Sequence, residues 1–298
     1  MNGVLLMLPD FALIALGALL ARRLRFPDGF WSGVEKLVYF VLFPPLLFHA
    51  IGTAKFSLIS TQWFLITGLA AMGGAVALGF LGHPLLRVPG NIFASSVQTA
   101  FRFNSFVGFA LASSLYGTEG LALMALLTAL WVPIANLVAV SSLAGQGGQN
   151  VWRELARNPL ILSTAAGLAF NLSGLTLPEP ATVLLQRLGS ASLALGLLAI
   201  GAGLRFADAN SFRPVIAWFA TVRLALVPAL AFGLALLAHL STLELQVLVL
   251  FAALPTASTC YILAVRMGGH GPVVAAIITV QTLLAMFTLP AWVAASSA

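Results

Sequence analysis

Two polar side chains interrupt the apolar stretch 91–115 close to its middle. Arg102 and Asn104 lie where a membrane-spanning helix would pass the centre of a bilayer. An arginine at that depth costs about 2.5 to 3.5 kcal/mol on insertion scales, so it should face protein or a water-filled cavity. Asn104, close to Gly108, indicates an interrupted helix whose amide and freed backbone groups can receive a ligand. In the alternative, Arg102 reaches toward the cytoplasm or caps carbonyls of a neighbouring helix.

A second polar break lies in the apolar stretch 244–265, where Pro255 is followed by three hydroxyl residues. Proline removes a backbone donor and frees a carbonyl, which is tolerated at membrane depth only where protein or water satisfies the freed groups. The alternative is a simple proline kink. Two interrupted spans at matching places in the two halves of a chain indicate a binding site near the membrane midplane. The predicted substrate-binding residues are Arg102, Asn104, Ser105, Pro255, Thr256, Ser258 and Thr259.

Three further polar residues are candidates for an ion site or a secondary site: Gln98, Arg223 and His49. Arg223 lies near the middle of the apolar stretch 211–238 and has no evident intramembrane acid to pair with. Either an anionic ligand supplies its counter-charge or Arg223 is a structural cap. His49 follows the pair Pro44-Pro45, which more often marks a kink than a site.

The sequence lacks the signatures of an intramembrane enzyme. It contains no H-E-x-x-H, no G-x-S-x-G, no aspartate-rich prenyl-diphosphate motif and no paired intramembrane aspartates. The single cysteine, Cys260, excludes a disulfide framework and a cysteine-rich metal site. We therefore expect neither catalysis nor a bound metal. Most basic residues occupy short connections, so a nucleic-acid partner is not expected either.

Membrane helices are the elements that must position these residues. Of the 298 residues, 60% are apolar and 7% are charged, whereas soluble proteins carry about 25% charged residues. The sequence predicts an all-α polytopic membrane protein. Its ten expected transmembrane helices lie near residues 3–21, 31–51, 59–82, 91–115, 119–142, 159–175, 180–204, 211–238, 244–265 and 271–295.

A polar connection at residues 144–158 divides the chain into five spans and five spans. Because five is odd, the second half must enter the membrane from the opposite side. The halves 1–143 and 159–298 are therefore predicted to form an inverted repeat. An offset of 154 residues pairs Gly117 with Gly271 and Asn104 with Ser258.

The distribution of basic residues predicts the topology. With the N-terminus outside, the odd-numbered connections hold nine arginines and the even-numbered ones hold only Lys55. This bias predicts a cell (inner) membrane protein with both termini outside the cytoplasm and the linker 144–158 inside it. The nine arginines are Arg22, Arg23, Arg25, Arg87, Arg153, Arg157, Arg205, Arg213 and Arg266.

Several segments resemble bacterial members of the auxin efflux carrier family, which includes malate and malonate permeases. They are residues 102–111, Gly117 with Gly120, Val132-Pro133 with Asn136, and residues 43–48, 158–160, 195–201 and 254–257. The resemblance implies ten spans, with helices four and nine broken and crossing at the midplane. It also implies a scaffold of spans 1, 2, 6 and 7 that often forms a homodimer, and a transport domain of spans 3–5 and 8–10. In such proteins the substrate carboxylate meets the asparagine that corresponds to Asn104.

The residues and the resemblance together predict a secondary transporter of a small organic anion, a mono- or dicarboxylate, that works by alternating access. Arg102 and Arg223 outnumber the mid-membrane acids, and half-helix N-termini add roughly half a positive charge each. No cofactor is expected, and the coupling ion, if there is one, is Na⁺ or H⁺. The alternative is a coupled symporter with the bile-acid-symporter-like fold, in which Gln98, Asn104 and Ser258 bind sodium. A membrane sensor would need a signalling domain, for which the length leaves no room.

The topology can be tested by labelling single cysteines on a Cys260→Ser background. We expect a cysteine at position 149 to react with a membrane-impermeant reagent only after the membrane is opened, because the charge distribution places the linker in the cytoplasm. A cysteine at position 55 should react in intact cells. Labelling of position 149 from outside alone would overturn the predicted orientation.

Overall fold

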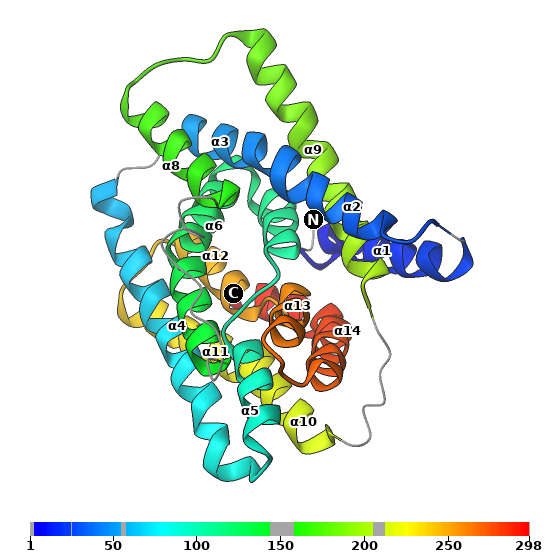
Figure 1. Ribbon diagram of the computed structural model, residues 1–298. Helices are drawn as coiled ribbons and strands as arrows, with labels where there is room; N and C mark the ends of the chain where they lie inside the picture. The colour runs from blue at the N-terminus through cyan, green and yellow to red at the C-terminus, as the bar shows by residue number, and fades with distance from the viewer. Residues whose placement is uncertain (1–2, 25, 55–57, 144–157, 205–211, 298) are drawn as a thin grey trace. The chain divides into compact units, whose positions relative to one another are not determined.

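The computed structural model describes residues 3–24, 26–54, 58–143, 158–204 and 212–297 (Figure 1). All regular structure in these ranges is helical, which confirms the all-α prediction. Apart from Asn158, the linker 144–158 lies outside the described residues. The same holds for several basic residues on which the predicted topology rests: Arg25, Lys55, Arg153, Arg157 and Arg205.

In chain order the helices are α1 (Gly3–Arg23), α2 (Phe30–Leu37), the π-helix η1 (Val38–Leu42), α3 (Phe43–Thr53), α4 (Leu58–Leu86), α5 (Gly90–Val97), the 3₁₀-helix η2 (Gln98–Ala100), α6 (Ser105–Leu143), α8 (Pro159–Leu172), α9 (Glu179–Ala202), α10 (Arg213–Thr221), the π-helix η4 (Val222–Leu226), α11 (Val227–Leu237), α12 (Thr242–Ala253), α13 (Thr259–Arg266) and α14 (Gly271–Ser296).

Six helical segments of the described residues are long and apolar enough to cross a membrane. They are Phe30–Thr53, Thr61–Leu86, Gly90–Leu143, Glu179–Ala202, Arg213–Leu237 and Gly271–Ser296. The segment Gly90–Leu143 covers two predicted spans, which Gly117 separates with a φ of 63° that glycine adopts readily. The apolar helices α8 and α12 are shorter. The structure therefore gives a multi-span helical protein, while the number ten stays a prediction.

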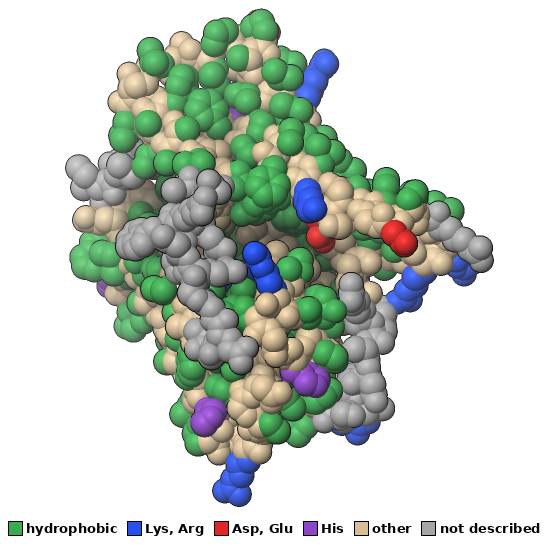
Figure 2. Space-filling model, in the orientation of Figure 1, with side chains coloured by type: hydrophobic (Ala, Val, Ile, Leu, Met, Phe, Trp, Pro, Cys, Tyr) green, Lys and Arg blue, Asp and Glu red, His purple; other side chains and the backbone are tan. Residues whose placement is uncertain are grey.

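Large apolar side chains on the surface fit a lipid environment. Phe287 is 76% exposed, and Phe40 and Trp63 are each 59% exposed. Figure 2 shows hydrophobic side chains over most of the visible face, with few charged ones between them. A water-soluble protein rarely exposes so much contiguous apolar surface, so the composition and the surface agree on a membrane protein.

The chain forms two compact units. The first comprises Met1–Thr61, Phe106–Ala129 and Trp152–Gly203, and the second comprises Gln62–Ser105, Leu130–Val151 and Leu204–Ala298. The predicted spans one, two, six and seven all belong to the first unit. The second unit contains most of spans three, eight, nine and ten, together with residues 62–105 and 130–143.

Small residues hold the helices of the first unit close together. A Cβ atom at Gly201 of α9 would overlap the Ile14 carbonyl oxygen of α1, and one at Gly17 would overlap the backbone of Leu198. In the same unit, the Asn171 side chain at the end of α8 donates hydrogen bonds to the carbonyls of Ile51, Gly52 and Ala54, at 3.0, 3.3 and 2.8 Å. These bonds satisfy the C-terminal carbonyls of α3, which have no partner within the helix.

Helix α12 forms the centre of the second unit. Every side chain from Val247 to Leu254 is completely buried. A helix that is apolar on all sides must be surrounded by protein or lipid, and here α11 and α14 pack against it. At its start, Ser241 and Glu244 form a capping box, in which each side chain bonds the backbone N–H of the other. The interruption that follows Ala253 is therefore deep inside packed protein.

The close contact between α1 and α9 predicts that Gly201→Ala destabilises the protein. The added methyl group has to displace the backbone of α1, and overpacking of this kind costs about 1 to 3 kcal/mol. Thermal unfolding of the purified protein in detergent measures the effect. Gly233→Ala in α11 is the matched control, because a Cβ there meets no atom within 4 Å. Equal unfolding temperatures for the two variants would contradict the packing described for α1 and α9.

Candidate anion-binding site

Two helices of the second unit are interrupted, and the interruptions have the same spacing as the predicted repeat. The run of α5 and η2 ends at Ala100, and α6 begins at Ser105. Helix α12 ends at Ala253, and α13 begins at Thr259. Ser105 and Thr259 are 154 residues apart, which is also the spacing between the bonded residues Arg102 and Thr256. The backbone thus leaves the helical path twice, at sequence positions related by one offset.

The two interrupted segments hydrogen-bond to each other. The Asn104 N–H donates to the Pro255 carbonyl at 2.8 Å. In the other direction, the Thr256 hydroxyl donates to the Arg102 carbonyl at 3.0 Å. Each segment therefore satisfies a backbone group that the other has lost from its helix, and the two segments form one structural feature.

Neutral hydrogen-bond acceptors hold the Arg102 guanidinium. Its two terminal nitrogens donate to the Gln98 amide oxygen at 2.9 Å and to the Thr259 hydroxyl at 3.3 Å. Gln98 is fixed in turn, because its nitrogen donates to the carbonyls of Ser95 and Cys260 at 3.1 and 3.2 Å. A guanidinium has five N–H donors. These bonds therefore orient the guanidinium plane, but they occupy only some of its donors and do not neutralise its charge.

Gln281 of α14 joins three segments of the second unit and is itself completely buried. Its amide oxygen accepts from the Thr256 N–H at 3.0 Å. Its amide nitrogen donates to the carbonyls of Phe219 and Thr99, at 2.9 and 3.4 Å. Sequence reasoning missed this residue, although an amide in the middle of the apolar stretch 271–295 was an available signal.

Trp131 supports the first interruption from α6. Its indole N–H donates to the Phe101 carbonyl at 2.9 Å, and the ring is 3% exposed. Trp131 was not among the predicted site residues. A buried indole that bonds a freed carbonyl is a structural support for the break.

Arg223 is completely buried and bonds backbone carbonyls. Its Nε donates to the Leu254 carbonyl at 2.6 Å, and its terminal nitrogens donate to Phe251 at 3.1 Å and Ala100 at 3.5 Å. Of the two roles that the sequence left open, this arrangement matches the structural cap.

The remaining predicted residues differ in exposure and place. Asn104 is 5% exposed, Pro255 and Thr256 are buried, Ser105 and Ser258 are half-buried, and Thr259 is exposed. Together with Arg102, Gln98 and Arg223, all of them belong to the second unit. His49 lies on α3 of the first unit, where its carbonyl accepts from the Thr53 hydroxyl at 2.7 Å. Nothing in the described contacts links His49 to the other candidates.

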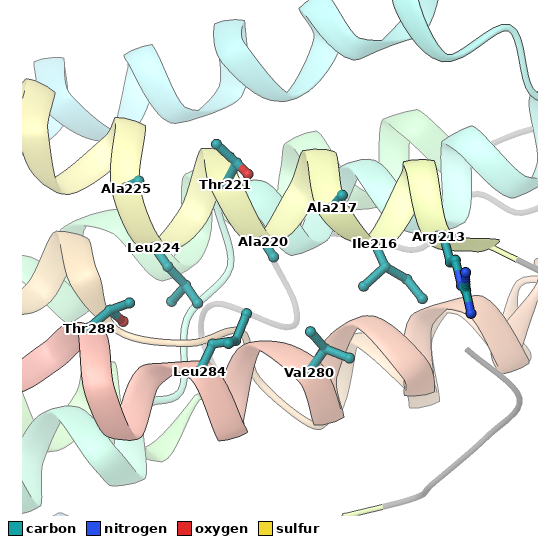
Figure 3. A pocket seen from close by; sticks show the side chains of 10 residues that line it. All are labelled: Arg213, Ile216, Ala217, Ala220, Thr221, Leu224, Ala225, Val280, Leu284 and Thr288. Carbon is teal, nitrogen blue, oxygen red and sulfur yellow. The ribbon is translucent and has the colours of Figure 1, made fainter. Parts of the chain in front are cut away.

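A separate groove of about 600 Å³ runs between α10–η4 and α14. In Figure 3, Ile216, Ala220 and Leu224 face Val280 and Leu284 across it. Most of its lining is apolar, and none of the predicted site residues contributes to it. Its polar lining residues are Arg213, Thr221 and Thr288. The interrupted segments bring together more polar side chains and freed backbone groups, so they are the better candidate for an anion.

Comparison with known proteins agrees with this architecture. A family described as "Membrane transport protein" matches residues 146–293. The second half of the chain is thus similar to this family of membrane transporters. The predicted resemblance to auxin efflux carriers is thereby confirmed, and the protein is a membrane transporter and not an enzyme.

The curated relatives span most of the chain. A protein of Rhizobium meliloti strain 1021 named "Putative malonate transporter" is 27% identical, over 95% of this chain and 92% of its own length. An uncharacterized transporter of Methanothermobacter thermautotrophicus is 25% identical, over 88% of this chain and 87% of its own. The uncharacterized transporter YfdV of Escherichia coli K12 is 24% identical, over 96% of this chain and 95% of its own length. The similarity to transporters thus extends across both halves of the chain.

The bonds of Gln281 predict that Gln281→Leu destabilises the transporter. Leucine leaves the buried Thr256 N–H without a partner, which costs about 1 to 3 kcal/mol for that group alone. Gln246→Leu is the control, because the Gln246 amide nitrogen donates to the Ser297 hydroxyl at an exposed position, at 3.2 Å. Thermal unfolding of both variants measures the difference. An unchanged midpoint for Gln281→Leu would show that water replaces the amide and that the site is wetter than described.

Proposed function

We propose that this protein is a secondary transporter of small organic anions, mono- or dicarboxylates, which it binds between the interrupted segments 101–104 and 254–258. The observation that carries the proposal is the Arg102 guanidinium. It is half-buried, it is held by two neutral side chains, and no carboxylate is among its partners in the described part of the chain. A charge at membrane depth is costly without a counter-charge, and a carboxylate substrate supplies one.

Two helix starts add to the positive potential at these segments. α6 begins next to Asn104, and α13 begins next to Ser258. A helix N-terminus carries roughly half a positive charge and presents backbone N–H groups to an anion. Asn104 is the proposed hydrogen-bond donor to the carboxylate, a role that also follows from the family resemblance. Thr256, Ser258 and Thr259 are proposed to line the opposite wall.

The relatives narrow the choice of substrate to test. The name of the Rhizobium meliloti relative refers to malonate, a small dicarboxylate that fits the class proposed from Arg102. We therefore take malonate as the first anion to test on this protein, with a monocarboxylate of similar size beside it.

Alternating access is proposed to occur about the two breaks. The equal spacing of the helix starts supports an inverted repeat of residues 1–143 and 159–298, with helices four and nine broken and crossing. We also propose that spans 1, 2, 6 and 7 form a scaffold that makes a homodimer in the inner membrane, with both termini outside, and that the six remaining spans carry the substrate. Residues 106–129 group with the first unit, so the fourth and fifth spans connect these two parts.

The proposal predicts graded effects at Asn104 and Arg102. Asn104→Ala removes a hydrogen bond to a charged group, worth about 1.5 to 3 kcal/mol, and should weaken malonate binding roughly 10- to 150-fold. Arg102→Gln should abolish binding, because it removes the counter-charge. Arg102→Lys tells whether the guanidinium touches the substrate: a bidentate contact makes lysine fail too, whereas a purely electrostatic role lets it keep much of the affinity.

Malonate-dependent shifts of the unfolding temperature, measured on purified variants, give these affinities. Uptake of labelled malonate into proteoliposomes tests transport itself. Arg266→Gln is the matched control, because this arginine is exposed at the end of α13 in the same unit. Malonate stabilisation that is the same in Asn104→Ala and the unmodified protein would remove Asn104 from the site.

A further inference from the structure

The polar atoms around Arg223 form a cluster in which two helix ends meet one cation. The Leu254 and Phe251 carbonyls belong to the C-terminal end of α12, and the Ala100 carbonyl ends η2. Met72 of α4 adds its sulfur, 3.8 Å from a terminal nitrogen. All of these groups are neutral, and Arg223 has no exposed surface.

The charges of this cluster balance. Each helix C-terminus carries roughly half a negative charge, because its last carbonyls have no partner within the helix. Two such ends, those of α12 and of the run formed by α5 and η2, amount to about one negative charge. One guanidinium neutralises them. A buried arginine without an acidic partner is therefore explained by the two helix ends that it faces.

In membrane carriers with interrupted helices, unwound carbonyls and half-helix C-termini are the groups that coordinate a coupling cation. In this protein the corresponding carbonyls already have donors. Arg223 bonds Ala100, Phe251 and Leu254, Gln281 bonds Thr99, and Trp131 bonds Phe101.

We propose that Arg223 is a fixed cation that occupies the carbonyl cluster at the ends of α12 and η2, so that this cluster holds no exchangeable sodium ion. The guanidinium supplies the charge that a bound Na⁺ would supply, and it positions both interruptions. Arg223 is thus a positioning residue for the anion site and not a ligand of the anion. It follows that sodium does not bind at this cluster to drive substrate movement. This consequence rests on the proposed transport function.

The test is chemical rescue of Arg223→Ala. Truncation leaves a guanidinium-sized space lined by carbonyls, and it should lower the unfolding temperature by roughly 10 °C, as expected when a buried charge is removed from its partners. Guanidinium chloride at a low, non-denaturing concentration should raise that temperature, whereas choline chloride at the same concentration should not. Arg266→Ala, at an exposed position, is the control. Its unfolding temperature should not rise in guanidinium chloride, and neither should that of the unmodified protein.

Two further variants keep the test decisive if Arg223→Ala does not fold. Arg223→Lys retains the charge, and Arg223→Met retains much of the volume without it. We expect the lysine variant to be the more stable of the two. A methionine variant as stable as the lysine variant, or an alanine variant that guanidinium does not rescue, would overturn the proposal.

Measurements in sodium chloride and in choline chloride distinguish a failure of this proposal from a failure of the proposed transport function. The unmodified protein should unfold at the same temperature in sodium and choline chloride, and Arg223→Ala should gain more from sodium than from choline. Stabilisation of the unmodified protein by sodium that disappears in Arg223→Ala would contradict a fixed cation. If malonate is taken up, its rate should not depend on sodium. Absence of uptake for every anion would refute the transport function and leave the rescue result standing.

Discussion

Backbone groups that leave a helix inside a membrane protein must find partners within the protein, because lipid offers none. The rest of the second unit depends on this constraint. The segments 101–104 and 254–258 release several carbonyls and N–H groups at once. Arg223, Gln281, Trp131 and Gln98 bond carbonyls at or beside the two breaks, and Gln281 also accepts from one freed N–H. These four side chains come from η4, α14, α6 and η2, so four separate helices supply the partners that allow the two breaks to stay open.

The same constraint gives the two mid-membrane arginines different tasks. Arg223 faces carbonyls at helix C-termini, where the potential is negative, and is completely buried. Arg102 lies beside two helix starts, where the potential is positive, and its bonds go to neutral side chains. The first arginine relieves an electrostatic imbalance of the fold, while the second adds to one. An imbalance that the fold leaves uncompensated is where a charged substrate gains most, which is why we propose Arg102 and not Arg223 as the residue for an anion.

The sequence predicted the helical class from its apolar composition, and it drew attention to segments 101–104 and 254–258, because an arginine with an asparagine and a proline with hydroxyls are conspicuous in apolar stretches. It could not predict how the interruptions are satisfied. Gln281 is one amide in an apolar helix, and its three partners lie at least 25 residues away in the chain. The π-helices η1 and η4 were also missed. They precede Pro44 and Pro228, whose missing N–H groups break the regular α-helical bonding.

The helix starts that follow the two breaks are 154 residues apart, and the side chains at positions with this spacing differ in charge. Ser105 and Thr259 both start a helix. Arg102 has Thr256 as its counterpart, and this threonine bonds the arginine's own carbonyl. These two positions thus meet across the two breaks, yet only one of them carries a guanidinium. Two helix starts with like polarity make such a region attractive to anions in general. The single guanidinium of Arg102, oriented by Gln98 and Thr259, adds a full positive charge to that region, which is why we propose it as the group that faces a carboxylate.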